Sequence, residues 1–323
     1  MKNDDRQRSL FGKPVPPSKT VEAVAVEPKL ADIARSLPSN VRFGTSSWSF
    51  PGWEGLVYDR KSSKQTLARV GLQAYAKHPL LNTVGIDRTY YRPVTADELA
   101  TYRQQVPEDF RFLVKATRDC CSPRLASRQS NPLFLDPHWT TDQVVQPFME
   151  GLEETGERLV FQFPPLGPQI LKQPERFLER LQSFFAELPR GPSYAVELRD
   201  ESLLFPNLAT ALTDQGVHIC YSLHSRMPPL QRQRELLGQT EATPLTARWM
   251  LHSGLGYEAA IERYEPFDQL VDEDPGTRSA LTAACEENVL AGHSVLVIVN
   301  NKAEGSSPLS VFRLAEALSV LLD

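Results

Sequence analysis

The 323-residue sequence is short of cysteine and histidine and contains no long hydrophobic run. Its four cysteines are Cys120, Cys121, Cys220 and Cys285. They include no C-x-x-C pair, so we expect reduced thiols rather than zinc ligands or disulfides. No apolar run approaches the roughly 18 residues of a membrane span, and residues 1–5 lack the apolar core of a signal peptide. These absences predict a cytoplasmic protein without membrane contact.

An excess of basic residues is also missing, because the formal net charge is −5. This mild acidity argues against nucleic-acid binding over the whole surface, although it leaves room for a local basic patch. The proportions of hydrophobic and charged residues are ordinary for a globular protein. We therefore expect a globular domain with any nucleic-acid contact restricted to one region.

Residues 1–40 lack clear hydrophobic periodicity and are interrupted by five prolines. This composition predicts a poorly ordered arm in front of a globular domain at 41–323. Within the arm, Gln7, Leu10 and Phe11 form a short motif similar to the peptides that dock on bacterial sliding clamps, where leucine and phenylalanine fill an apolar pocket. A sliding clamp is thus a candidate partner, and a tail with two stray hydrophobic residues is the alternative.

Eight short apolar runs, most of them followed by a helical pattern, succeed one another in the rest of the chain. They occupy residues 41–47, 82–87, 111–115, 158–163, 194–199, 217–224, 246–252 and 294–301. Seven of the runs end in a polar or charged residue, and the run 158–163 has Gln162 next to its last residue. Buried parallel strands that present polar groups at their carboxyl ends are typical of a (β/α)8 barrel. The sequence therefore predicts an α/β TIM barrel whose site lies at those ends.

Charged residues close two of the predicted strands. Lys115 ends the third, where a desolvated lysine serves as phosphate ligand, ion-pair partner or amine nucleophile. Glu197 and Arg199 share one face of the fifth strand because they are two residues apart. Charges that point into a barrel are costly unless they are paired or functional. A buried structural ion pair is the alternative to a catalytic role.

Three further features mark the same end of the barrel. Trp48 and Trp53 lie in the first loop, where their indole rings would either stack on a ligand or close the barrel mouth by packing. His252 ends the seventh run and is a candidate general base or metal ligand, whereas a lone histidine is more often a structural hydrogen-bonding residue. Residues 302–307 precede a helix start, where many barrels bind phosphate.

Seven motifs occur in a fixed order along residues 41–322. They are Gly44–Trp53, Thr89–Arg92, Phe110–Ala116, Gln162–Pro165, Val196–Arg199, Leu251–His252 and Asn300–Asn301. Together they resemble the YecE-like family, also known as domain of unknown function 72. The resemblance implies a TIM barrel without an established activity and with shared polar residues at the strand ends. A likeness to endonuclease IV-like barrels has been drawn for the family, so nucleic acid is a candidate partner.

The resemblance implies a site from its matched motifs. Its members are Lys115, Gln162, Glu197, Arg199, His252 and Asn300, with Tyr91 and Asn301 beside them. The sequence departs from the family pattern at several positions. Gly85 replaces a glutamate, Met250 an arginine and Lys302 an aspartate. These changes predict either a divergent subgroup with altered chemistry or a member without activity. They also predict that Lys115 pairs with Glu197, because a neighbouring carboxylate is missing at Gly85.

Three functions fit these residues. The first is a hydrolase or lyase acting on a phosphorylated or nucleic-acid substrate, with Glu197 as general acid or base, His252 as second proton carrier, and Lys115 and Arg199 as anion ligands. The second is a non-catalytic binding module that uses the barrel mouth and the arm, and the third is a nucleotide or sugar-phosphate sensor. No cofactor is indicated. A metal is weakly indicated, because the strand ends offer few ligands.

Overall fold

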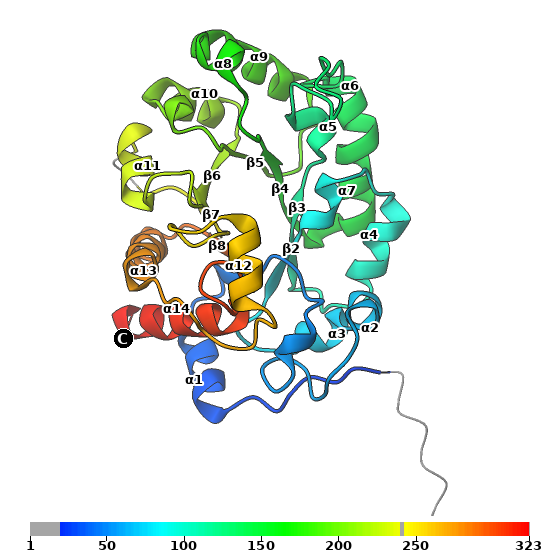
Figure 1. Ribbon diagram of the computed structural model, residues 1–323, viewed down its shortest axis with the longest axis vertical. Helices are drawn as coiled ribbons and strands as arrows, with labels where there is room; N and C mark the ends of the chain where they lie inside the picture. Colours follow the sequence, from blue (N-terminus) through cyan, green and yellow to red (C-terminus); the bar gives the residue numbers. More distant parts are fainter. Residues whose placement is uncertain (1–19, 240–241, 323) are drawn as a thin grey trace, which may run out of the picture.

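The computed structural model describes residues 20–239 and 242–322. Eight parallel strands pair in chain order, and the last strand pairs with the first, so the sheet is a closed barrel (Figure 1). The strands are β1 (Val41–Thr45), β2 (Thr83–Ile86), β3 (Arg111–Lys115), β4 (Gly156–Gln162), β5 (Tyr194–Glu197), β6 (His218–Leu223), β7 (Leu245–Trp249) and β8 (Val295–Val299). The prediction of a (β/α)8 barrel is confirmed.

Helices surround the barrel (Figure 1). They are α1 (Pro28–Ser36), α2 (Lys64–Val70), α3 (Leu72–Tyr75), α4 (Ala96–Arg103), α5 (Arg118–Cys121), α6 (Pro137–Thr140), α7 (Gln146–Leu152), α8 (Pro168–Leu171), α9 (Pro174–Glu187), α10 (Pro206–Asp214), α11 (Leu230–Leu236), α12 (Tyr257–Tyr264), α13 (Pro275–Leu290) and α14 (Ser307–Leu322). Many of them begin with proline, whose missing N–H has no intrahelical acceptor at that position. Within the described ranges, no helix is long and apolar enough to cross a membrane.

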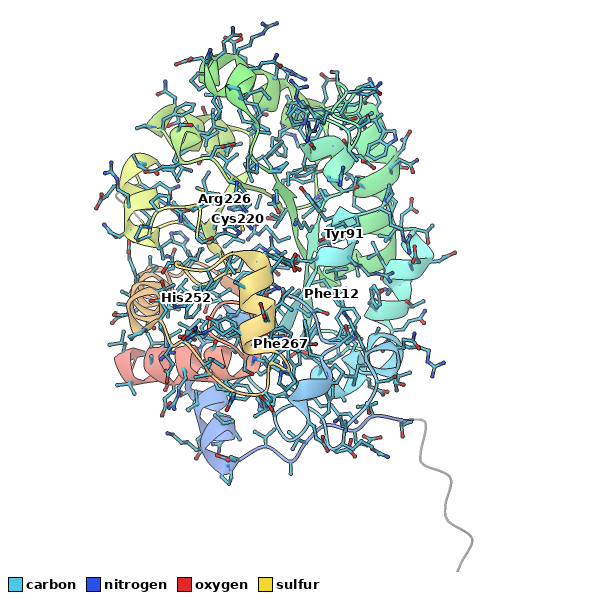
Figure 2. All side chains as sticks on the ribbon, in the orientation of Figure 1. Tyr91, Phe112, Cys220, Arg226, His252 and Phe267 are labelled. Carbon is cyan, nitrogen blue, oxygen red and sulfur yellow. The ribbon has the colours of Figure 1, made fainter. Side chains whose placement is uncertain are left out.

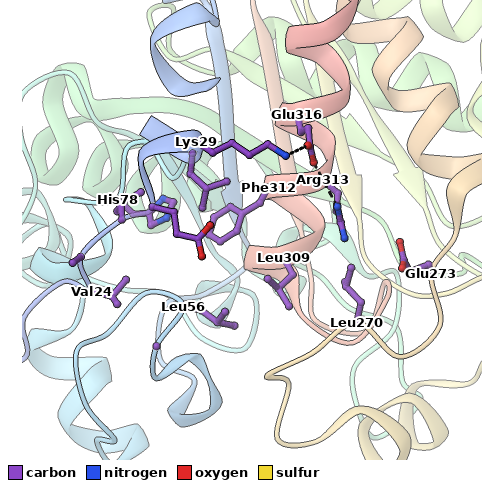
Figure 3. Close-up of a pocket in the computed structure, with 15 residues that line it drawn as sticks. Val24, Lys29, Leu56, His78, Leu270, Glu273, Leu309, Phe312, Arg313 and Glu316 are labelled. Carbon is purple, nitrogen blue, oxygen red and sulfur yellow. Dashed lines mark hydrogen bonds and ion pairs between the residues drawn. The ribbon is translucent and has the colours of Figure 1, made fainter. Parts of the chain in front are cut away.

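Residues 20–40, the second half of the predicted arm, include helix α1. Helix α1 packs against α14, and Val21 and Ile33 are buried in the core. Two buried apolar side chains offset the cost of ordering this short segment. A cavity of about 460 Å³ lies between this segment and α14, where His78 stacks on Phe312 at 4.6 Å (Figure 3). The motif at Gln7, Leu10 and Phe11 lies outside the described residues.

The four cysteines are buried free thiols. Burial raises the pKa of Cys121, Cys220 and Cys285. The Sγ atoms of Cys120 and Cys121 are 3.8 Å apart and are not bonded as a disulfide. A buried thiol with a raised pKa is a poor nucleophile, because little of it is ionised near neutral pH. These cysteines therefore act as small packing residues.

Helix α4 begins with the capping box that the Thr95-x-x-Glu98 spacing predicts. The Thr95 hydroxyl accepts the Glu98 N–H at 3.2 Å, and the Glu98 carboxylate accepts the Thr95 N–H at 3.4 Å. We expect Thr95→Ala to lower the free energy of unfolding by about 1 kcal/mol, measured by urea denaturation. The control is Ser183→Ala at an exposed position of α9, which should change stability by less than about 0.5 kcal/mol. Equal losses in both variants would contradict a specific cap.

The interior of the barrel changes from apolar to polar along the strands. Its apolar layer consists of Leu113, Val160, Ala195, Cys220, Leu296 and Ile298. Side chains two residues apart on a strand share one face. Five residues of the apolar layer are followed, two positions later, by side chains that also point into the barrel. These side chains lie nearer to the carboxyl end of the barrel. They are Lys115, Gln162, Glu197, Ser222 and Asn300. The strand period thus brings a polar layer together from separate parts of the chain.

Candidate functional site

Arg248 lies at the centre of the polar layer and connects three strands. It comes from β7 and is fully buried. One of its terminal nitrogens donates to Oε2 of Glu197 at 2.6 Å. The other donates to both carboxylate oxygens of Asp87, which follows β2, at 2.6 Å. The guanidinium therefore bridges two carboxylates, which together raise its pKa against the opposing effect of burial.

Glu197 is the buried anion of this network. Its carboxylate also pairs with Arg199 at 2.5 Å and accepts the Ser222 hydroxyl at 3.2 Å. Burial favours its neutral form, but Arg199, Arg248 and Lys115 outweigh burial and lower its pKa to about 2. Glu197 is therefore ionised at neutral pH. A carboxylate with this pKa is a fixed counterion and is poorly suited to the proton-carrying role that the sequence predicts.

Lys115 does not form the expected pair with Glu197, and this prediction is wrong. In the described part of the chain, the ion pairs of Glu197 go to Arg199 and Arg248, which occupy both carboxylate oxygens. The Lys115 ammonium instead lies 3.6 Å from the centre of the Tyr90 ring. Burial lowers the pKa of Lys115 to about 8, partly opposed by Asp87. The amine is therefore close to its titration point at neutral pH.

An open cavity of about 520 Å³ covers the polar layer at the carboxyl ends of the strands. Its cationic lining residues are Lys64, Arg88, Lys115, Arg199, Arg226 and Lys302. Among the residues that the structure describes, Asp87 is the one carboxylate that lines it. Burial lowers the pKa of Lys302 to about 8, and its Nζ lies 4.5 Å from the centre of the Tyr257 ring. We call this space the cationic cavity.

The cationic cavity includes several residues that the sequence predicts. Gln162, Arg199 and Asn300 line it together with Lys115. The Asn300 side-chain amide donates to the Ser46 hydroxyl at 2.7 Å, which holds the ends of β8 and β1 together. Tyr91 lies at the mouth and is 74% exposed (Figure 2). All seven motifs of the sequence therefore contribute residues to one cavity.

Trp48 and Trp53 do not line the cationic cavity. The sequence left ligand stacking and packing as alternatives for these two indoles, and the structure shows packing. The Trp48 indole N–H donates to the Leu67 carbonyl at 3.1 Å. Trp53 is fully buried and packs against Phe50 and Tyr58. Large aromatic rings gain most from complete burial. The expected ligand stacking by these two indoles is therefore not supported.

Asn301 and His252 also lie away from the predicted arrangement. The side-chain Oδ1 of Asn301 accepts the backbone N–H and the hydroxyl of Ser307 at 2.8 and 2.7 Å, so it stabilises the start of α14. His252 follows β7, which ends at Trp249, and does not line the cationic cavity. Its backbone N–H donates to the Lys302 carbonyl at 2.9 Å. The structure therefore does not bring His252 to Glu197.

The charges that appeared to be lost at Gly85 and Met250 are supplied two residues away. Asp87 follows Gly85 by two positions, and Arg248 precedes Met250 by two. A shift of two positions keeps a side chain on the same face of its strand, so Asp87 and Arg248 point the same way as residues 85 and 250. The Arg248 guanidinium pairs with the Asp87 carboxylate at 2.6 Å. The sequence signal was a charged residue inside an apolar run, Arg248 within Leu245–Trp249. Among the described residues, no group of three or more His, Cys, Asp or Glu could hold a metal ion.

The family comparison covers nearly the whole barrel. Residues 42–321 match the family described as "Protein of unknown function DUF72". The chain belongs to this family. A DUF72 protein from Enterococcus faecalis V583 is 18% identical, with 86% of this chain and 95% of that chain covered and a TM-score of 0.56. A DUF72 protein from Thermotoga maritima MSB8 is 20% identical, with 86% and 98% covered and a TM-score of 0.54.

These two solved structures show the fold that DUF72 proteins share with this chain, and at such low identity they show the fold alone. No curated protein matches the chain. The family match over residues 42–321 confirms the resemblance to the YecE-like family.

Proposed function

We propose that this DUF72 barrel binds a phosphorylated small molecule in the cationic cavity. The observation that carries the proposal is the charge of the lining, which has six cations and one carboxylate among the described residues. Two of these cations, Arg88 and Arg199, are paired with Glu98 and Glu197 outside the lining. Asp87, that carboxylate, is already bound to Arg248. Nη1 of Arg199 is buried without a hydrogen-bond partner in the described structure, so a phosphate oxygen would satisfy it. Charge-assisted hydrogen bonds of this kind are stronger than neutral ones.

The chemistry that fits best is a lyase reaction on a phosphorylated aldehyde or ketone. With a pKa of about 8, Lys115 is neutral in about a tenth of molecules at pH 7. Its amine lone pair attacks the carbonyl carbon, and loss of water leaves a protonated imine on Lys115. In a substrate with a β-hydroxyl group, the bond between the α and β carbons then breaks, and its electron pair converts the imine into an enamine on Lys115. The β fragment leaves as an aldehyde and its hydroxyl proton passes to water. Addition of a proton and water to the enamine releases the second product and regenerates the amine. We favour this over hydrolysis, because Glu197 and Asp87 are both held by arginines and are poor general bases.

The proposal is tested by calorimetry and by chemical trapping. Glycolaldehyde phosphate with borohydride should give a covalent adduct on Lys115 that mass spectrometry locates. Lys115→Met should remove the adduct and weaken ethyl phosphate binding about tenfold, because the cavity loses one of its cations. Arg232→Met, on the exposed face of α11, is the matched control and should change neither result. Failure of every phosphate compound to bind would overturn the proposal, and binding without an adduct would remove the lyase chemistry.

The second candidate function is non-catalytic binding of single-stranded nucleic acid. It is favoured by Tyr91 and Tyr257, which lie at the mouth of the cationic cavity and are 74% and 53% exposed. Exposed aromatic rings beside cations are suited to stacking of unpaired bases. Under this function a fluorescent oligonucleotide should bind more tightly than ethyl phosphate. The double variant Tyr91→Ala/Tyr257→Ala should then lose oligonucleotide binding and keep ethyl phosphate binding.

The arm would add a tether to the binding function. Its motif at Gln7, Leu10 and Phe11 is outside the described residues, so the test uses a peptide of residues 1–19 and a bacterial sliding clamp. The peptide should bind, and a Leu10→Ala/Phe11→Ala version should not. Equal binding of both peptides, or binding of neither, would contradict the tether.

A further inference from the structure

A second cavity of about 380 Å³ adjoins the cationic cavity. Its apolar lining residues are Leu223, Met227, Pro228, Pro229, Leu230, Trp249, Leu251 and Ala280. They come from β6 and the segment after it, from the end of β7 and from α13. We call this space the apolar annex. Most of its lining side chains are apolar, whereas the cationic cavity has six cationic side chains in its lining.

His224 and Leu251 line both spaces and so form the boundary between them. Burial lowers the pKa of His224 to about 4, and the nearby Arg199 acts in the same direction. The ring is therefore neutral near pH 7. The Nδ1 atom of His224 accepts the backbone N–H of Arg226 at 3.2 Å, which places the ring proton on Nε2. The boundary thus presents an uncharged ring, so an apolar group can pass beside it without desolvating a cation.

Two of the polar side chains at the edge of the apolar annex, Asp274 and Thr277, are already bound to each other. The Asp274 carboxylate accepts the backbone N–H of Thr277 at 2.9 Å and its hydroxyl at 2.7 Å, as the cap of α13. The Gln233 amide behind the annex donates to the Ser222 and Pro228 carbonyls. Water in an apolar space with few free polar partners is weakly held. The annex is therefore suited to an apolar group rather than to a second polar one.

We propose that the ligand of this barrel is a phosphate monoester that also carries an apolar group, either an alkyl chain or a single aromatic ring. The phosphate lies against Arg199 and Lys302 in the cationic cavity, and the apolar group passes His224 into the apolar annex. This inference rests on the proposed function for its anionic half. It adds the class of ligand that the barrel selects. A polar phosphorylated sugar would leave the annex without a complementary group.

The test measures the affinities of ethyl, butyl, hexyl and phenyl phosphate by calorimetry with the full chain. Each added methylene should tighten binding about two- to fourfold until the annex is filled. Ala280→Phe fills the annex from α13 and should abolish this increase while it leaves ethyl phosphate affinity unchanged. The matched control is Ser279→Phe, an exposed neighbour on the same helix, which should keep the increase. Met227→Trp fills the annex from the segment after β6 and is a second variant, should Ala280→Phe fail to fold.

Each other outcome overturns the inference in a distinguishable way. Equal affinities for all four esters would show that the apolar annex binds no part of the ligand, while the cationic cavity would still be a phosphate site. An increase with chain length that survives in both Ala280→Phe and Met227→Trp would place the apolar group elsewhere. Absence of binding by all four esters would overturn the proposed function together with this inference.

Discussion

Replacing Glu197 with glutamine is expected to lower the free energy of unfolding by about 3 to 5 kcal/mol. Glu197 is fully buried and holds Arg199 and Arg248 at 2.5 and 2.6 Å. A neutral amide leaves both guanidinium groups buried with Asp87 as their nearest remaining counterion. An unbalanced buried charge costs far more than the loss of one hydrogen bond. Urea denaturation at pH 7 measures the difference directly.

The same variant should change how stability depends on pH. The folded-state pKa of Glu197 is about 2, below its ordinary value of 4.5. The contribution of the carboxylate is therefore present above about pH 4.5 and is lost as the pH falls towards 2. Glu197→Gln lacks this part of the acid dependence. The control is Glu235→Gln in the exposed pair with Arg232, which should cost less than about 1 kcal/mol. Equal urea midpoints for Glu197→Gln and the unaltered protein would contradict the buried network.

Binding of ethyl phosphate is expected to weaken about 100-fold between pH 7 and pH 9. Lys115 and Lys302 both line the cationic cavity, and burial lowers the pKa of each to about 8. An anion binds the protonated amines, so affinity is full below pH 8 and falls as the pH rises above it. Each lysine is about tenfold less protonated at pH 9, and two such sites together give the expected factor. The ester itself remains a dianion over this range.

Calorimetry of lysine variants shows which amine causes the pH dependence of ethyl phosphate binding. Lys115→Met and Lys302→Met should each reduce the decrease to about tenfold, because one titrating amine remains. The double variant should bind weakly and with little dependence on pH. Arg226→Met removes a lining cation that does not titrate in this range, so it should lower affinity and keep the full pH dependence. A flat profile in the unaltered protein would show that neither lysine contacts the phosphate.

The fold and part of the site could be predicted from the sequence because strand periodicity is a local signal. The run Arg111–Lys115 shows both its apolar centre and its polar end without any knowledge of other strands. The same reasoning places Gln162 and Asn300 at the carboxyl end of the barrel, where the structure has them. Each of these positions depends on one strand and on the alternation of its faces.

The pairing of charges could not be predicted, because it depends on geometry between distant strands. Arg248 and Asp87 are 161 positions apart, and no local pattern joins them. Comparison at single positions suggested a loss at Gly85 and Met250, whereas the structure keeps both charges at neighbouring inward positions. The end of β7 was also decisive. Because β7 ends at Trp249, His252 lies in the following loop and the inward charge is Arg248.

The burial of all four thiols has a practical consequence for spectroscopy. Every cysteine of the sequence lies within the barrel domain and has less than 3% of its surface exposed. A maleimide dye added to the native protein should therefore find no accessible target. A single Tyr91→Cys substitution at the cavity mouth would then be labelled selectively, because residue 91 is 74% exposed. The emission of that dye would follow ligand arrival in real time, without a need to remove any natural cysteine.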